Sequence, residues 1–168
     1  MSLFLRKIQT YPTAKIVKTE IHQNFQTMNF KLLDQTLSSF LVLLWTYTGL
    51  DKIISFEKNL KALHNQIFSG DIAEILSYTI PGIELLLALF LVLKTTRWWG
   101  YLGSTLLLSV FTTYIGLIWI GAFPRVPCTC AGIFESMSWT THLIVNSIFL
   151  ICSILGLWTL GVLNKKFG

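Results

Sequence analysis

Residues 72–93 read IAEILSYTIPGIELLLALFLVL, and this apolar run indicates the class of the protein. An α-helix needs about 20 consecutive apolar residues to cross the roughly 30 Å hydrocarbon core of a bilayer. The run has that length, and its hydrophobicity continues around the whole helix instead of forming one stripe, as contact with lipid requires. We therefore predict a membrane-spanning helix here.

Three further stretches have the same character, at about residues 32–54, 98–123 and 141–163. Over the whole chain 53% of the residues are hydrophobic and 12% are charged, and the mean hydropathy is +0.63. A soluble domain would need far more charge to cover its surface. The sequence thus predicts an all-α protein, an integral membrane four-helix bundle over residues 32–168. A basic segment, residues 1–31, precedes it and is expected to be cytoplasmic or to lie at the membrane interface.

The distribution of basic residues predicts the orientation. Nine of the thirteen Lys and Arg residues lie in the N-terminal segment, in the turn between the second and third spans, or at the C-terminal end. The positive-inside rule therefore predicts that both termini are cytoplasmic. The loops at about residues 55–71 and 124–140 then face the periplasm of a bacterial inner membrane. Because the cations sit at the ends of apolar runs, they indicate contact with the lipid bilayer and no nucleic-acid partner.

The second of these outward loops contains two cysteines, Cys128 and Cys130, in the sequence FPRVPCTCAG. Two thiols one residue apart can form a small, strained disulfide, and strain makes such a bond easily exchanged. Redox chemistry is the favoured interpretation in the oxidising compartment. A structural loop disulfide and half of a metal site are the alternatives, with His64 as the other outward ligand, although we predict no metal. Cys152, inside the fourth span, is expected to behave as a small hydrophobic residue.

Four polar residues in the spans are candidates for the same chemistry. His142 begins the fourth helix, where the helix dipole favours neutral imidazole, and it would accept a thiol proton, donate to a quinone or make a capping contact. Asn146 lies one turn deeper on the same face. Glu84 follows Pro81 in the second span and is either functional or hydrogen-bonded to a neighbouring helix. Tyr114, in the third span, would donate to the same interior.

Four segments together give the chain a resemblance to the MauE/DoxX-like family of redox-associated membrane proteins. They are Gly49-Leu50-Asp51-Lys52, Pro81-Gly82-Ile83-Glu84-Leu85, Cys128-Thr129-Cys130-Ala131-Gly132 and the stretch from Trp139 to Asn146. The resemblance covers roughly Ser39 to Leu163, and the Cys-x-Cys loop is its most specific part. It implies a four-helix architecture similar to that of vitamin K epoxide reductase, assistance to disulfide formation alongside a periplasmic thioredoxin-like partner, and a link to quinones.

The chain departs from the quinone-linked thiol oxidases in one respect, because its first outward loop contains no second cysteine pair. A separate thioredoxin-like protein would have to supply that half of the relay. Our leading hypothesis is a membrane thiol–disulfide exchange protein with Cys128, Cys130 and His142 as reacting residues and a quinone near Asn146, Glu84 and Tyr114. The rival is a non-enzymatic membrane subunit of a larger complex, in which the cysteines form a structural disulfide. A transporter is a third possibility, weakened by the expectation that no second intramembrane charge accompanies Glu84.

Overall fold

A computed structural model of the chain describes residues 13–65, 70–122 and 138–167, with side chains described between residues 28 and 163. Regular secondary structure in these residues is helical throughout, with no strand, as the sequence predicts. The helices are α2 (Thr13–Ile54), α3 (Phe56–His64), α4 (Gly70–Val92), α5 (Arg97–Trp119) and α6 (Trp139–Phe167).

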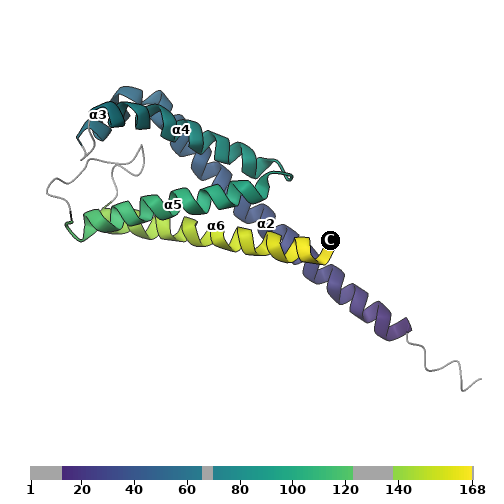
Figure 1. Ribbon diagram of the computed structural model, residues 1–168. Coiled ribbons are helices and arrows are strands. Elements are labelled where there is room, and N and C mark those ends of the chain that lie inside the picture. The colour runs from purple at the N-terminus through teal and green to yellow at the C-terminus, as the bar shows by residue number, and fades with distance from the viewer. Residues whose placement is uncertain (1–12, 66–69, 123–137, 168) are drawn as a thin grey trace, which may run out of the picture.

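Four of the helices are long and apolar enough to cross a bilayer, namely 28–54 of α2, all of α4 and α5, and 139–163 of α6. The prediction of a four-span membrane bundle is therefore confirmed. The N-terminal part of α2 and the C-terminal end of α6 lie at the same end of the bundle (Figure 1). Which side of the membrane that end faces stays a prediction.

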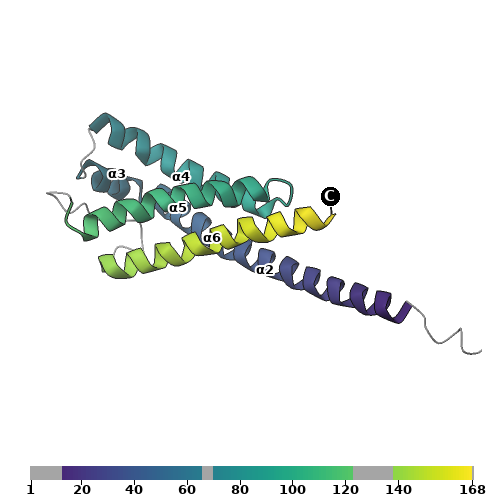
Figure 2. The same ribbon diagram turned by 60° about the horizontal axis from the view of Figure 1, so that its bottom comes forward.

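The four spans form two pairs. Helix α2 packs along α4, and α5 packs along α6 (Figures 1 and 2). Helices α4 and α5 meet at the turn formed by residues 93–96 and diverge toward the opposite end, beside α3. We call these the turn end and the α3 end. The two pairs therefore lie farther apart at the α3 end than at the turn end.

Helix α5 ends earlier than the sequence suggested. The expected span ran to Phe123, but the helix stops at Trp119. Gly121 has a positive φ of 72°, and the amides of Gly121 and Ala122 donate to the carbonyls of Ile118 and Leu117. This is the glycine-terminated C-cap that ends many helices, and the hydrophobicity of the following residues conceals it.

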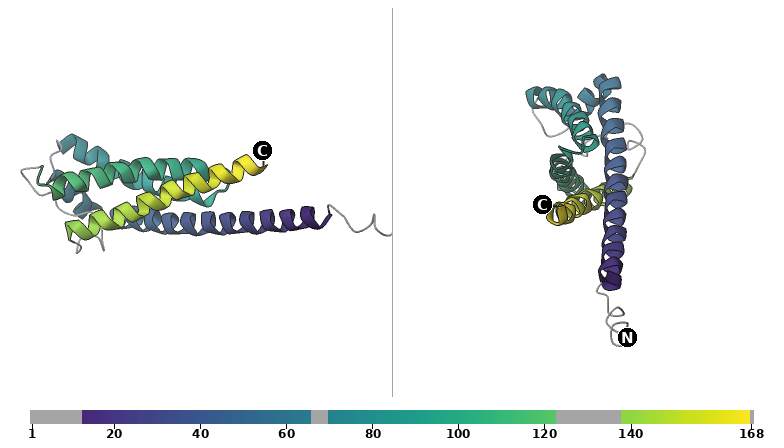
Figure 3. Two further views of the ribbon diagram at one scale, coloured as in Figure 1. Left: turned by 90° about the horizontal axis from the view of Figure 1, so that it is seen from below. Right: turned by 90° about the vertical axis from the view of Figure 1, so that its right-hand side faces the viewer.

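Two segments differ from the prediction. Residues 55–71, predicted as a loop, contain the two-turn helix α3, which buries Leu63 and places the Phe56 ring 4.7 Å from the ring of Tyr78. Helix α2 begins at Thr13, so residues that we expected to form a tail or interfacial helix continue the first span without a break. Its 42 residues correspond to about 63 Å of helix, twice the hydrocarbon thickness. Its N-terminal part extends past the bundle (Figure 3).

Candidate functional site

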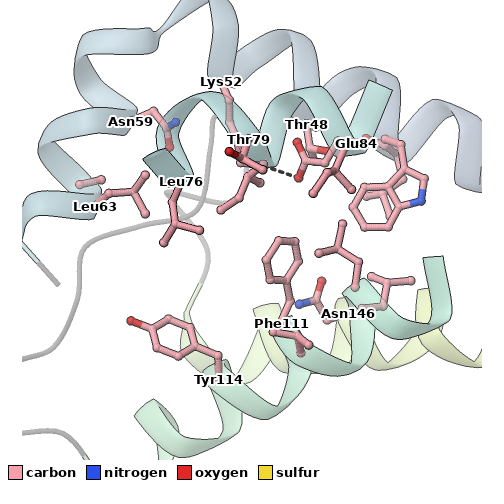
Figure 4. Close-up of a pocket in the computed structure, with 18 of the residues that line it drawn as sticks. Thr48, Lys52, Asn59, Leu63, Leu76, Thr79, Glu84, Phe111, Tyr114 and Asn146 are labelled. Carbon is pink, nitrogen blue, oxygen red and sulfur yellow. Dashed lines mark hydrogen bonds and ion pairs between the residues drawn. The ribbon is translucent and has the colours of Figure 1, made fainter. Parts of the chain in front are cut away.

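A cavity of about 370 Å³ lies at the α3 end, between the two pairs of helices. All five helices contribute to its walls, and most of the lining is apolar side chains such as Leu44, Leu108 and Phe111. Figure 4 shows that the labelled polar residues of α2, α3 and α4 lie along one side, opposite Phe111 and Tyr114. Largely apolar cavities with a few convergent polar groups are typical small-molecule sites.

The strongest electrostatic feature of the cavity is an ion pair inside the membrane-spanning region. Lys52 of α2 places its Nζ 2.5 Å from Oε1 of Glu84 in α4, and the two side chains are 13% and 1% exposed. Gly49 makes this contact possible, because a Cβ at that position would lie 3.0 Å from the Leu85 side chain and 3.4 Å from the Glu84 Cβ. The Gly49-Leu50-Asp51-Lys52 and Pro81-to-Leu85 segments, 32 residues apart, thus meet at one ion pair.

The ion pair leaves part of the carboxylate unused. Glu84 is fully buried, yet its Oε2 has no hydrogen-bond partner. A second polar atom of the cavity wall, Asn59 Nδ2 from α3, is also buried without a partner. Buried polar groups are nearly always hydrogen-bonded, because an unsatisfied one costs about 1–3 kcal/mol. One acceptor and one donor in a single cavity therefore indicate a ligand that satisfies both.

Helix α6 brings two of the predicted residues to the cavity. His142 and Asn146, one turn apart, both line it and are 5% and 8% exposed. Helix α6 begins at Trp139, and the hydroxyl of the preceding residue, Ser138, accepts a hydrogen bond from the Thr141 amide at 3.3 Å. Capping by Ser138 leaves His142 in the first full turn with its side chain turned inward. Its expected capping role therefore falls to Ser138.

The structure brings all four polar candidates of the spans to one cavity. Tyr114 of α5 and Glu84 of α4 line the same space as the two residues of α6. Glu84 does have a second intramembrane charge beside it, Lys52, which contradicts the expectation of an isolated acid. The expectation failed because Lys52, near the end of the predicted span 32–54, was counted among the cations of the outward loop, whereas it lies within helix α2, which ends at Ile54.

Cys128 and Cys130 lie outside the described residues. The segment that contains them leaves α5 after Ala122 and joins α6 at Ser138, and the ends of both helices lie at the α3 end with the cavity (Figure 1). Cys152 is a free thiol that packs against the core cluster around Trp45 and Tyr101, in agreement with its predicted hydrophobic role. Within the described ranges no three His, Cys, Asp or Glu side chains group as they would around a metal ion.

Sequence reasoning missed Lys52 and Asn59 as members of the site. A signal for Lys52 existed, since an acid inside a membrane span generally requires a partner, and Lys52 stands near the expected end of the adjacent span. No comparable signal marked Asn59, because α3 itself was not predicted and its orientation against α4 depends on packing.

A second ion pair occupies the turn end, where α2 meets α5. Arg97 Nη1 lies 2.7 Å from Asp34 Oδ2, and the Tyr101 hydroxyl lies 3.0 Å from Asp34 Oδ1. Arg97 Nε also donates to the Leu91 carbonyl at 2.9 Å, which ties the end of α4 to the cluster. Gly156 of α6 accommodates the Tyr101 ring, because a Cβ there would come within 2.1 Å of it.

Comparison with known proteins gives one match. The sequence profile of the family described as Methylamine utilisation protein MauE matches residues 30–159, which include nearly all of the four spans and every residue of the cavity. No curated protein and no solved structure matches the chain.

Proposed function

The chain belongs to the MauE family of methylamine utilisation membrane proteins, and from that premise we propose that it is a membrane thiol–disulfide exchange protein. Its Cys128 and Cys130 exchange electrons with a periplasmic thioredoxin-like partner, and a quinone held in the cavity connects them to the membrane. The observation that supports this most strongly is the position of the cavity. It gathers His142, Asn146 and Glu84 at the end of the bundle where the cysteine-bearing segment begins and ends.

The thiol step follows from ordinary exchange chemistry. A thiolate of the partner attacks the Cys128–Cys130 disulfide and forms a mixed disulfide, and the partner's second thiol then displaces it. The partner leaves oxidised, while Cys128 and Cys130 are left as two thiols that have gained two electrons and two protons. The segment lies on the periplasmic side if the positive-inside orientation holds, where disulfides form and persist.

The residues of the cavity fit a quinone. The walls are apolar enough for a ring and the start of an isoprenoid tail, and buried polar atoms without partners lie beside them. When bound, a quinone accepts the two electrons and two protons of the dithiol, and the disulfide forms again. His142, at the first turn of α6, is suitably placed to move a thiol proton inward, and Asn146 is placed to orient a ring oxygen.

Trapping of the mixed disulfide tests the proposal. Cys128→Ser and Cys130→Ser variants, expressed singly, should differ, because the cysteine attacked first retains the partner when the resolving thiol is missing. We expect one variant to accumulate a covalent complex with a thioredoxin-like protein that reducing agent dissolves, and the double variant to accumulate none. If both single variants oxidise the partner as fully as the parent protein does, the exchange mechanism is excluded.

A non-enzymatic subunit remains the second candidate, favoured by one observation. The sequence has three cysteines, and the third, Cys152, is a free thiol that packs against the core cluster. Cys128 and Cys130 therefore have no second cysteine pair with which to form a relay. Alkylation of the folded protein before and after mild reduction separates the two functions. A pair that becomes reactive after mild reduction indicates exchange, whereas a pair that resists reduction until the protein unfolds indicates a structural disulfide.

A further inference from the structure

The donors and acceptors in the cavity wall restrict the chemistry of the ligand more than the volume of the cavity does. The ammonium of Lys52 lies 2.5 Å from Glu84 Oε1 and favours the ionised carboxylate, whose other oxygen accepts hydrogen bonds and donates none. Asn59 Nδ2 can only donate. Both atoms are buried and lack partners. A ligand that satisfies the wall must therefore offer a donor at Glu84 and an acceptor at Asn59.

The two oxidation states of a quinone differ in this respect. The carbonyl oxygens of the oxidised ring accept hydrogen bonds and donate none. A carbonyl placed beside Glu84 Oε2 would therefore form no hydrogen bond with it, because both atoms are acceptors. The hydroxyls of the hydroquinone both donate and accept. The reduced ring can donate one hydroxyl to Glu84 and still receive a hydrogen bond from Asn59 on its other oxygen.

We propose that the cavity selects the hydroquinone form of a membrane quinone, with Glu84 Oε2 accepting one ring hydroxyl and Asn59 Nδ2 donating to the opposite ring oxygen. Lys52 is then a positioning residue that keeps Glu84 ionised and fixes its orientation. This inference rests on the proposed function, which gives a quinone as the ligand. It goes further because it predicts the direction in which electrons flow.

Selective binding of the reduced form raises the reduction potential of the bound ring, because binding and reduction are thermodynamically linked. A tenfold preference corresponds to about 30 mV for a two-electron couple. The cavity therefore makes the bound ring a stronger oxidant than the free ring. Electrons flow from the Cys128–Cys130 dithiol to the membrane, which leaves the cysteines oxidised and ready to oxidise a partner.

The cavity also has a route to the lipid phase. Ile83 of α4 and Val110 of α5 line it and are 39% and 63% exposed, although both lie within membrane-spanning helices. These residues lie on the two helices that diverge from the turn (Figures 1 and 2). A ring with an alkyl tail can thus enter sideways between α4 and α5, leaving its tail among the lipids.

Binding of a short-chain probe tests the preference. The full chain in lipid nanodiscs, with Cys128→Ser and Cys130→Ser so that the probe is not turned over, is titrated anaerobically with decylbenzoquinone and with its hydroquinone. We expect the hydroquinone to bind at least tenfold more tightly, because it makes one additional hydrogen bond to a charged group. Equal affinities, tighter binding of the oxidised probe, or no binding of either would overturn the proposal.

Two substitutions assign the roles. Glu84→Gln offers an amide donor in place of an acceptor-only oxygen, so the ratio of the two dissociation constants should fall to about one. Asn59→Leu removes a contact that both forms make, so both should weaken by the same factor with an unchanged ratio. Glu74→Gln, an exposed acid on the same helix, is the matched control and should change neither constant. A ratio unaffected by Glu84→Gln would overturn the assignment.

A second variant guards against loss of folding. If Glu84→Gln alone fails to fold, the double variant Lys52→Gln/Glu84→Gln removes both charges and tests the same ratio. The outcome is separable from that of the proposed function. Ligand binding is measured in a protein without the reactive cysteines, whereas trapping of a mixed disulfide depends on the cysteines and not on the ring.

Discussion

The two ends of the bundle each contain a carboxylate of one span paired with a cation of another, and they use it differently. At the turn end, Asp34 has both carboxylate oxygens occupied, one by Arg97 and one by Tyr101. At the α3 end, Glu84 has one oxygen paired with Lys52 and the other without a partner beside a cavity. Both acids are buried, so burial does not distinguish them.

The difference shows how a buried charge in a membrane protein can be assigned a role. A network in which every atom is satisfied stabilises one arrangement of the helices, whereas a partly satisfied one is costly unless something completes it. We therefore interpret the Asp34–Arg97–Tyr101 cluster as structural and the Lys52–Glu84 pair as part of a binding site. Substitutions at the two ends of the bundle test this distinction.

Loss of Arg97 should have the largest effect on stability. Arg97→Met leaves the Asp34 carboxylate buried without its cation, which we expect to lower the free energy of unfolding by about 3–5 kcal/mol. Reversible unfolding in mixed micelles measures this. The double variant Asp34→Leu/Arg97→Met should recover most of the loss, because no charge is then left unpaired. If Arg97→Met lowers the free energy of unfolding by less than about 1 kcal/mol, the ion pair contributes no more than a solvent-exposed one does. That result would contradict the structural role.

The next largest effect is expected at Gly156, where α6 contacts the same cluster. A Cβ there would lie 2.1 Å from the Tyr101 ring, so Gly156→Ala should move the ring away from Asp34 at a cost of about 1–3 kcal/mol. Gly161→Ala, on the same helix, is the control, because a Cβ there meets nothing within 4 Å. Similar unfolding free energies for the two variants would show that the packing of Tyr101 does not support the cluster.

Glu84→Gln should cost less than Arg97→Met, although both remove one partner of an ion pair. The Gln carbonyl still accepts a hydrogen bond from Lys52, and Lys52 stands close enough to the end of α2 for its ammonium to reach the interface. We expect a loss of about 1 kcal/mol, the contribution of one ordinary hydrogen bond. If Glu84→Gln and Arg97→Met destabilise equally in the same unfolding assay, the two ends do not differ in the way proposed.

The sequence was sufficient to predict much of the fold, because a membrane span must satisfy its own backbone and present apolar side chains to lipid. Hydrophobicity alone therefore located all four spans. It did not locate α3, whose nine residues are too short and too polar to stand out. The end of α5 was placed too late, since the positive φ of Gly121 is a matter of local backbone geometry.

The candidate site was predictable in part for a related reason. Polar residues inside spans are rare enough to be noticed singly, and Glu84, Tyr114, His142 and Asn146 were noticed in this way. That they share one cavity depends on the angle at which the helix pairs diverge, which no linear pattern encodes. The partners of the two acids were missed because Lys52 and Arg97 were read as charges at the ends of spans, where topology already explained them.

Substitution of Val110 should have the smallest effect on stability. It also tests most directly how a ligand enters the cavity. Val110 and Leu106 lie one turn apart on α5 and are 63% and 62% exposed, but only Val110 lines the cavity. Val110→Trp and Leu106→Trp should therefore both leave the unfolding free energy within about 0.5 kcal/mol of the parent. Val110→Trp narrows the route from the lipid, so it should slow the association of decylhydroquinone in stopped-flow measurements, whereas Leu106→Trp should not. Equal association rates in the two variants would place the entrance elsewhere, and a change in the dissociation constant without a change in rate would show that Val110 contacts the ligand without controlling its entry.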